Sequence, residues 1–418
     1  MSNFIKTSSI YVFSSILSAT IPFLLLPVLT RYLSPEQYGQ VAMFNMFTAG
    51  LASIIGLSVH GAANRRFFDK DVTNTQLARF NGNCLFILLS STVFALFVFS
   101  FFYSQIANYL GFPPVWIYFG ILNVCCSFLL TLRLGQWQIR GKAKLYGVLQ
   151  VTNSLVVISF SILFVVVLHL GAEGRIYGMI LTGVIIGFIS YCTLIKDKLF
   201  LFEYNRKDIN EALSFGIPLI PHVLGGFLLL SVDRLLINKE LGLEMTGVYM
   251  VAFSLGSALN IIFNSINKAY SPWLFARLKE NDFNKKIDIV KKTYLYFAFL
   301  LVMSLLAFFI APPLLKVMVG EKFYQAAEVL PILLIGQVFF GMYFMVTNYI
   351  FYVKKTKYLS YVTIFSGLIN VLLLFLLIPS YGISGAALAF LIANVLRFIG
   401  TWALSARLYS MPWALWRS

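Results

Sequence analysis

The chain has 418 residues, of which 59% are hydrophobic and 11% are charged. Soluble globular proteins carry about 25% charged residues, so this composition excludes that class and indicates a protein built for lipid. A net charge of +16 is compatible with a nucleic-acid partner. The basic residues fall in short stretches between long apolar runs, however, so we expect no nucleic-acid partner.

Apolar runs of about 20 residues recur along the chain, and a helix of about that length crosses the hydrocarbon core of a bilayer. The sequence predicts twelve spans, at 9–30, 39–61, 82–104, 114–135, 147–169, 175–195, 213–233, 246–269, 293–311, 328–352, 358–379 and 383–406. The first span follows a single Lys6 and has no small-residue cleavage site, so we expect it to stay attached. The predicted fold class is an all-α polytopic membrane protein.

Most of the 32 Lys and Arg residues fall in the loops on one side of the predicted membrane. The opposite side has only Arg31, Arg175, Arg234, Lys239, Lys316 and Lys322. Cytoplasmic loops hold the excess of basic residues, so both termini are expected to face the cytoplasm.

The longest polar interruption, "KDKLFLFEYNRKDINEALSFG" at 196–216, separates six predicted spans from six. Its mixed charge and apolar spacing predict an amphipathic segment at the cytoplasmic interface. We therefore expect a six-helix lobe at 1–195, a linker at 196–212 and a second six-helix lobe at 213–418.

The two halves resemble one another in sequence. The stretch "FLLLPVLTRYLSPEQYGQVAMF" (23–44) aligns with "FLLLSVDRLLINKELGLEMTGVYMVAF" (227–253), and 138–157 aligns with 351–373. Because each half has an even number of spans, corresponding spans point the same way. The repeat is then parallel, with a pseudo-twofold axis along the membrane normal. Two such bundles around a central cavity are more typical of transporters than of enzymes.

Charged residues mark the outer ends of the first span of each half. Asp233 and Arg234 lie at the end of span 213–233, and Arg31 lies at the end of span 9–30. These residues are either interfacial anchors or a cationic rim that handles an anionic substrate. In the second case Asp233 restrains the arginine and has a coupling or gating role.

Two basic or titratable residues fall deeper in predicted spans. Arg397, beside Asn394, lies 14 residues into span 383–406, where a charge costs about 2.5–3.5 kcal/mol on insertion scales. We expect it to face a water-filled cavity or a partner. His222 lies between a proline pair and a glycine pair, which indicates a loosened helix and a substrate site. A histidine satisfied within the bundle is an equal alternative.

His60, Arg65 and Arg66 end the second span at its cytoplasmic side. Basic doublets at this position usually follow from topology alone. The functional alternative is a loading site for a lipid diphosphate, because guanidinium groups match phosphate oxygens.

Amides and a lysine form a polar stripe on span 246–269. Asn260, Asn264, Asn267 and Lys268 are spaced so that they share one helix face. We expect this face, with Asn260, Asn264 and Lys268 foremost, to line a cavity.

No motif for cofactor or metal chemistry occurs in the sequence. The four cysteines lie in apolar runs without metal-ligand spacing, and Walker A, HExxH and GxSxG patterns are absent. We therefore expect no cofactor, no metal and no catalytic residue. Small residues four positions apart, such as Gly174 and Gly178 or Gly183 and Gly187, predict close helix packing.

The stretch "LLLPVLTRYLSPEQYGQVAMFN" resembles the first helix and loop of bacterial polysaccharide flippases of the O-antigen, Wzx type. The segment "SVDRLLINKELGLEMTGVYMVAFSL", with its G-x-Y step at Gly247 and Tyr249, resembles their seventh helix. These flippases belong to a superfamily that includes multidrug and toxin extruders and lipid II flippases, and the resemblance covers essentially the whole chain.

The resemblance implies transfer of an undecaprenyl-diphosphate-linked oligosaccharide from the cytoplasmic to the periplasmic leaflet of the inner membrane. It also implies alternating access, with coupling to protons or sodium left open. A glycan polymerase and a chain-length regulator are the implied protein partners. A monomer is expected, since the paired halves already supply two lobes.

Two other functions compete with the flippase. A proton- or sodium-coupled multidrug exporter would need a carboxylate in mid-membrane, and spans one to six offer none away from their ends. A membrane glycan polymerase or ligase would need a large outer loop, and the predicted outer loops are short.

Overall fold

Helices make up nearly all of the structure, a computed structural model that describes residues 2–69, 72–355 and 357–414, with side chains at all of these except 2–9, 12, 22 and 222. No strand occurs in these ranges. The prediction of an all-α polytopic membrane protein is confirmed. Contacts divide the chain into two compact units, Met1–Leu224 and Gly225–Ser418.

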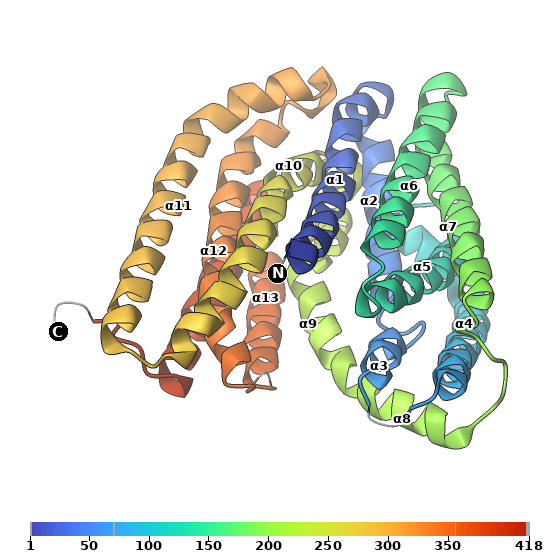
Figure 1. Ribbon diagram of the computed structural model, residues 1–418. Coiled ribbons are helices and arrows are strands. Elements are labelled where there is room, and N and C mark those ends of the chain that lie inside the picture. The colour runs from blue at the N-terminus through green and yellow to red at the C-terminus, as the bar shows by residue number, and fades with distance from the viewer. Residues whose placement is uncertain (1, 70–71, 356, 415–418) are drawn as a thin grey trace. The chain divides into compact units, whose positions relative to one another are not determined.

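The first unit is built around α5 (Val115–Ile139), which contacts most of the other helices of that unit (Figure 1). The others are α1 (Ser2–Tyr32), α2 (Pro35–Leu51), α3 (Val59–Arg66), α4 (Asn74–Leu110), α6 (Ala143–Ser161), α7 (Gly171–Lys196) and α8 (Arg206–Gly216). A π-helical turn, η1 (Ile162–Val167), extends α6, and a 3₁₀ turn, η2 (Ile217–Leu219), follows α8. Helix α9 (Ile220–Leu230) runs across the boundary between the two units.

In the second unit, α12 (Ala326–Tyr352) is the central helix and the most enclosed. It contacts α10 (Val232–Lys279), α11 (Phe283–Met318) and α13 (Lys357–Leu408), and a 3₁₀ turn, η3 (Glu321–Phe323), precedes it. An aromatic-rich core that includes Phe297, Tyr343 and Phe398 joins these helices.

Among the described residues, nine stretches are long and apolar enough to cross a membrane. Two of them, Arg206–Lys279 and Lys357–Leu408, each contain two of the predicted spans. The backbone breaks inside both, at Gly242 (φ 82°) and Gly382 (φ 58°). The nine stretches therefore account for eleven of the twelve predicted spans. The other one, 39–61, is interrupted.

That interruption separates α2 from α3 by a turn over residues 52–58. Gly56, Leu57 and Ser58 all have positive φ, a conformation that favours glycine. A Cβ at Gly56 would lie 2.4 Å from a ring carbon of Phe128, so this turn packs directly against α5. Non-helical backbone inside a membrane protein is tolerated only where it is buried in protein or lines a wet cavity.

The predicted linker, 196–212, packs on the first unit. The Leu201 amide donates to the Ala78 carbonyl across 3.0 Å, and the Asn81 side chain donates to the Leu199 carbonyl across 2.9 Å. The approach is so close that a Cβ at Gly82 would lie 2.0 Å from the Leu201 carbonyl oxygen. Helix α8, begun by an Asn205 cap, then runs crosswise against the ends of α3 and α4 (Figure 1).

Candidate functional site

A cavity of about 270 Å³ lies in the first unit, beside the turn between α2 and α3. Its lining combines amides, hydroxyls and one imidazole with five apolar side chains: Asn45, Thr48, Ala49, Ala52, Ile55, Ser58, His60, Asn123, Val124, Ser127, Phe128 and Thr131. His60 is half-buried and meets the Phe128 ring edge-on, with the ring centres 5.7 Å apart. The structure thus places one predicted site residue, His60, in a cavity rather than at a bare membrane edge.

A second cavity of about 150 Å³ lies between α5, α6 and α7. Asn123 and Ser127 line both cavities, so the two adjoin along α5. The second cavity also includes Asn153, Thr182 and Arg175. Arg175 donates through Nη1 to the Ser161 hydroxyl, while its buried Nε has no hydrogen-bond partner.

In the second unit, Asp233 and Arg234 form a buried ion pair, with Nη1 3.2 Å from Oδ1. Tyr249 donates to the other oxygen of Asp233 across 2.9 Å, and the Arg234 guanidinium lies 4.8 Å from the centre of the Phe253 ring. Asp233 therefore pairs with Arg234, and its gating role stays a prediction. The pair is 1% and 7% exposed, so it does not offer a bare guanidinium to solvent.

Arg397 is also buried, at 8% exposure, but its surroundings differ. Its guanidinium lies over two rings of α12, 3.9 Å from the centre of Tyr343 and 5.1 Å from that of Phe340. Its Nε has no hydrogen-bond partner. In the described part of the chain, Arg133, Arg234 and Arg397 are the buried arginines, and Arg397 is the one without a carboxylate partner.

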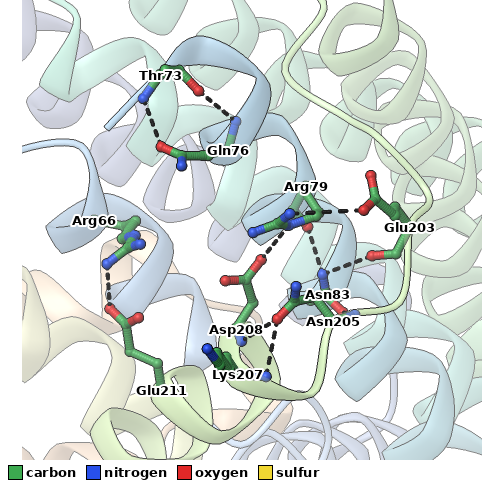
Figure 2. A network of polar contacts seen from close by, with 10 residues as sticks. All are labelled: Arg66, Thr73, Gln76, Arg79, Asn83, Glu203, Asn205, Lys207, Asp208 and Glu211. Carbon is green, nitrogen blue, oxygen red and sulfur yellow. Dashed lines mark hydrogen bonds and ion pairs between the residues drawn. The ribbon is translucent and has the colours of Figure 1, made fainter. Parts of the chain in front are cut away.

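A network of polar contacts joins α3 and α4 to the segment before and within α8 (Figure 2). Arg66 reaches Glu211 across 3.0 Å and Asp69 across 3.2 Å. Arg79 reaches Asp208 across 2.8 Å. Of the predicted basic doublet, Arg66 is therefore neutralised by acids, whereas Arg65 is exposed and lies 6.0 Å from the centre of the Phe215 ring.

The remaining predicted site residues line neither of the two cavities described above. Arg31, Asn264 and Lys268 are exposed, and Asn260 is half-buried with no hydrogen-bond partner for its Oδ1. His222 lies in α9, but its side chain falls outside the described part of the structure. A site role for these five residues stays a prediction.

Arg175 is the residue that sequence reasoning missed, because it was counted only as a loop charge on the outer side. A signal was present: it lies between Gly174 and Gly178, the pair expected to mark close packing. A Cβ at Gly178 would lie 3.2 Å from the Phe160 backbone, which agrees with that expectation. Arg175 lines the second cavity from this closely packed part of α7.

A profile described as "Polysaccharide biosynthesis protein" matches residues 4–279, which is more than half of the chain. The chain belongs to the polysaccharide biosynthesis protein family.

Two relatives are similar to this chain over most of its length, and the name of one of them describes a membrane protein. The Haemophilus influenzae "Lsg locus putative protein 1" is 26% identical over 373 residues, covering 88% of this chain and 89% of that protein. An "Uncharacterized membrane protein" from the same organism is 26% identical over 369 residues, covering 87% of this chain and 88% of that protein. The chain is therefore a multi-pass membrane protein of this family.

Two solved structures share its fold. An inward-facing multidrug resistance MATE transporter of the MOP superfamily has a TM-score of 0.74 at 17% identity, covering 93% of this chain and 94% of that chain. The lipid II flippase MurJ, in an inward closed conformation, has a TM-score of 0.74 at 16% identity, covering 95% and 86%. The fold of this family member is that of MOP-superfamily transporters, as the sequence resemblance implied.

Proposed function

We propose that the protein is a flippase that moves an undecaprenyl-diphosphate-linked oligosaccharide from the cytoplasmic to the periplasmic leaflet of the bacterial inner membrane. Both termini face the cytoplasm in this proposal, as the distribution of basic residues indicates. The family match and the fold shared with a lipid II flippase support a lipid-linked saccharide as the cargo.

The observation that carries the proposal is the charge on Arg397. A buried cation without a carboxylate partner is costly in a membrane protein and marks a functional position. The aromatic faces of Tyr343 and Phe340 stabilise it only in part. A guanidinium with an unfilled donor suits a diphosphate, because arginine matches phosphate oxygens in a bidentate fashion.

A diphosphate and its sugars also need a polar route, since transfer of charged groups through bare hydrocarbon costs tens of kcal/mol by Born reasoning. The two adjoining cavities of the first unit supply amides and hydroxyls, the groups that hydrogen-bond sugars. In this proposal the polyprenyl tail stays in lipid while the head group moves through protein.

An ion-coupled multidrug exporter is the second candidate, because a MATE transporter shares the fold equally well. Coupling to a proton or sodium ion would need an acid whose charge is available. Asp208 and Asp233 are the buried carboxylates of the described residues, and both are paired with arginine. This pairing favours the flippase over the exporter.

The test uses purified protein in liposomes that contain a fluorescent lipid-diphosphate oligosaccharide. The rate at which inner-leaflet sugar becomes accessible to an added glycosidase is measured for wild type, Arg397→Gln and Arg397→Lys, with and without ion gradients. We expect exposure faster than in empty liposomes, a loss of at least about tenfold in Arg397→Gln, and partial retention in Arg397→Lys.

A matched control is Arg407→Gln, which removes an arginine from the end of the same helix. This variant should flip at the wild-type rate. No acceleration by wild type under any gradient, together with export of cationic drugs, would replace the flippase with the exporter. If Arg397→Gln accelerates sugar exposure as much as wild type does, Arg397 does not lie on the transport path.

A further inference from the structure

The two cavities of the first unit contain one formal positive charge and no negative one. Arg175 lines the smaller cavity, and no residue that lines either cavity is acidic. The nearest acid in sequence, Glu173, is exposed and accepts a hydrogen bond from Tyr177. The charge of Arg175 is thus not neutralised by any ion pair among the described residues.

The hydrogen bonds of Arg175 leave one part of its guanidinium unfilled. Nη1 donates to the Ser161 hydroxyl, while Nε is buried and has no acceptor. A buried donor without an acceptor is costly, and more so when it is charged. A guanidinium edge pairs with two oxygens of a carboxylate or of a phosphate.

We propose that Arg175 binds the carboxylate of an acidic sugar inside the first unit. The cavity at Arg175, about 150 Å³, is large enough for a carboxylate group. The adjoining cavity of about 270 Å³, with Asn123 and Ser127 shared between the two, takes the sugar ring. The Phe128 ring and the hydroxyl of Thr131 in that cavity provide an apolar face and a polar contact for the sugar.

This inference rests on the proposed function for the source of the sugar, since an acidic residue of the transported oligosaccharide is the natural ligand. A free small carboxylate has the same chemistry. The two sources differ in size and in the use of the larger cavity, so they can be separated by experiment.

The experiment measures binding to the purified full-length protein in detergent, without any lipid-linked substrate. Glucuronate is the acidic-sugar probe, glucose is the matched neutral sugar and acetate is the free carboxylate. The variants are Arg175→Gln, Arg175→Lys and, as a control, Lys144→Gln, which removes an exposed cation from the same unit. Size-exclusion profiles and circular dichroism confirm that each variant is folded.

We expect glucuronate to bind wild type and Lys144→Gln equally, with glucose at least about tenfold weaker because it lacks a charge-assisted bond. Arg175→Gln should lose glucuronate binding, and Arg175→Lys should retain part of it. An Asn123→Ala variant, altered where the two cavities meet, should weaken glucuronate more than acetate. Equal acetate and glucuronate affinity, both lost in Arg175→Gln, would support the carboxylate site with a free small anion as its ligand.

Glucuronate binding that is absent, or that is the same in wild type and Arg175→Gln, would overturn the inference. Because flipping is not measured here, failure of the flippase proposal leaves this result intact. Conversely, a protein that flips a lipid-linked neutral oligosaccharide but does not bind glucuronate keeps the proposed function and loses the Arg175 site.

Discussion

Arg79 and Asp208 lie 129 positions apart in the sequence, yet Nε of Arg79 donates to Oδ2 of Asp208 across 2.8 Å. Asp208 is 5% exposed, and Glu203 lies 3.7 Å from Nη1 of the same arginine. Together with the Arg66 to Glu211 pair, these contacts fasten the segment that leads to the second unit onto the first (Figure 2).

Arg79→Ala should release this segment. Loss of the arginine leaves the largely buried Asp208 unpaired, and we expect a loss of about 3 kcal/mol in local stability. Hydrogen exchange in residues 199–212 should rise while the rest of the first unit is unchanged. The double variant Arg79→Ala/Asp208→Asn should be no less stable than Arg79→Ala alone, because both changes remove the same ion pair. Fully additive effects would contradict a shared interaction.

Asp233→Asn should destabilise the second unit strongly. It leaves the Arg234 charge buried without a carboxylate, which costs about 3–5 kcal/mol. Thermal unfolding in detergent measures the effect, with Glu240→Gln, an exposed acid on the same helix, as the control. Removal of both charges in Asp233→Asn/Arg234→Gln should recover part of the loss. If the double variant is less stable than Asp233→Asn, the ion pair is not what stabilises this site.

Tyr343→Leu should lower stability more than Tyr343→Phe. Phenylalanine keeps an aromatic face for Arg397, whereas leucine removes it, and a desolvated cation–π contact is worth about 2 kcal/mol. Melting temperatures of both variants are measured in lipid nanodiscs. Because neither variant has the hydroxyl, the difference between them reports the aromatic ring. In an Arg397→Leu background the difference should shrink, since no cation remains. A difference that persists there would assign it to packing alone.

Asp197 should make stability depend on pH in the acid range. Burial acts to raise the pKa of this carboxyl, but hydrogen bonds and charges from Arg133 and Lys142 outweigh it and hold the pKa below its ordinary value. A depressed folded-state pKa gives stability above the ordinary aspartate pKa of about 3.9, and this stability is lost as the pH falls through the folded-state value. The gap in melting temperature between wild type and Asp197→Asn should therefore be full at pH 7 and shrink below about pH 4. A gap that is the same at pH 7 and pH 3 would contradict this assignment.

The length of the apolar runs was enough to predict the membrane helices, because it can be read from the local sequence without knowing which residues pack together. The α2 to α3 break was not predicted, since its backbone depends on the packing of Gly56 against Phe128, a residue 72 positions later. Depth along a span identified Arg397 as an unusual charge and placed Arg234 at a membrane edge. Depth could not show that Arg234 has a carboxylate partner whereas Arg397 lies over an aromatic ring. Arg175 was missed because the sequence does not show that its buried Nε lacks a hydrogen-bond partner.

The close approach of Gly82 to the Leu201 carbonyl predicts how substitutions at position 82 affect the protein. In a deep mutational scan read out as glycan at the cell surface, position 82 should reject even alanine, because a Cβ has no room there. Its tolerance profile would then resemble that of a residue on the transport path, although Gly82 contacts a connecting segment and lines neither cavity. Protein abundance, measured beside surface glycan for each variant, separates the two: Gly82 variants should disappear from the membrane, whereas Arg397 variants should remain there and fail to transport.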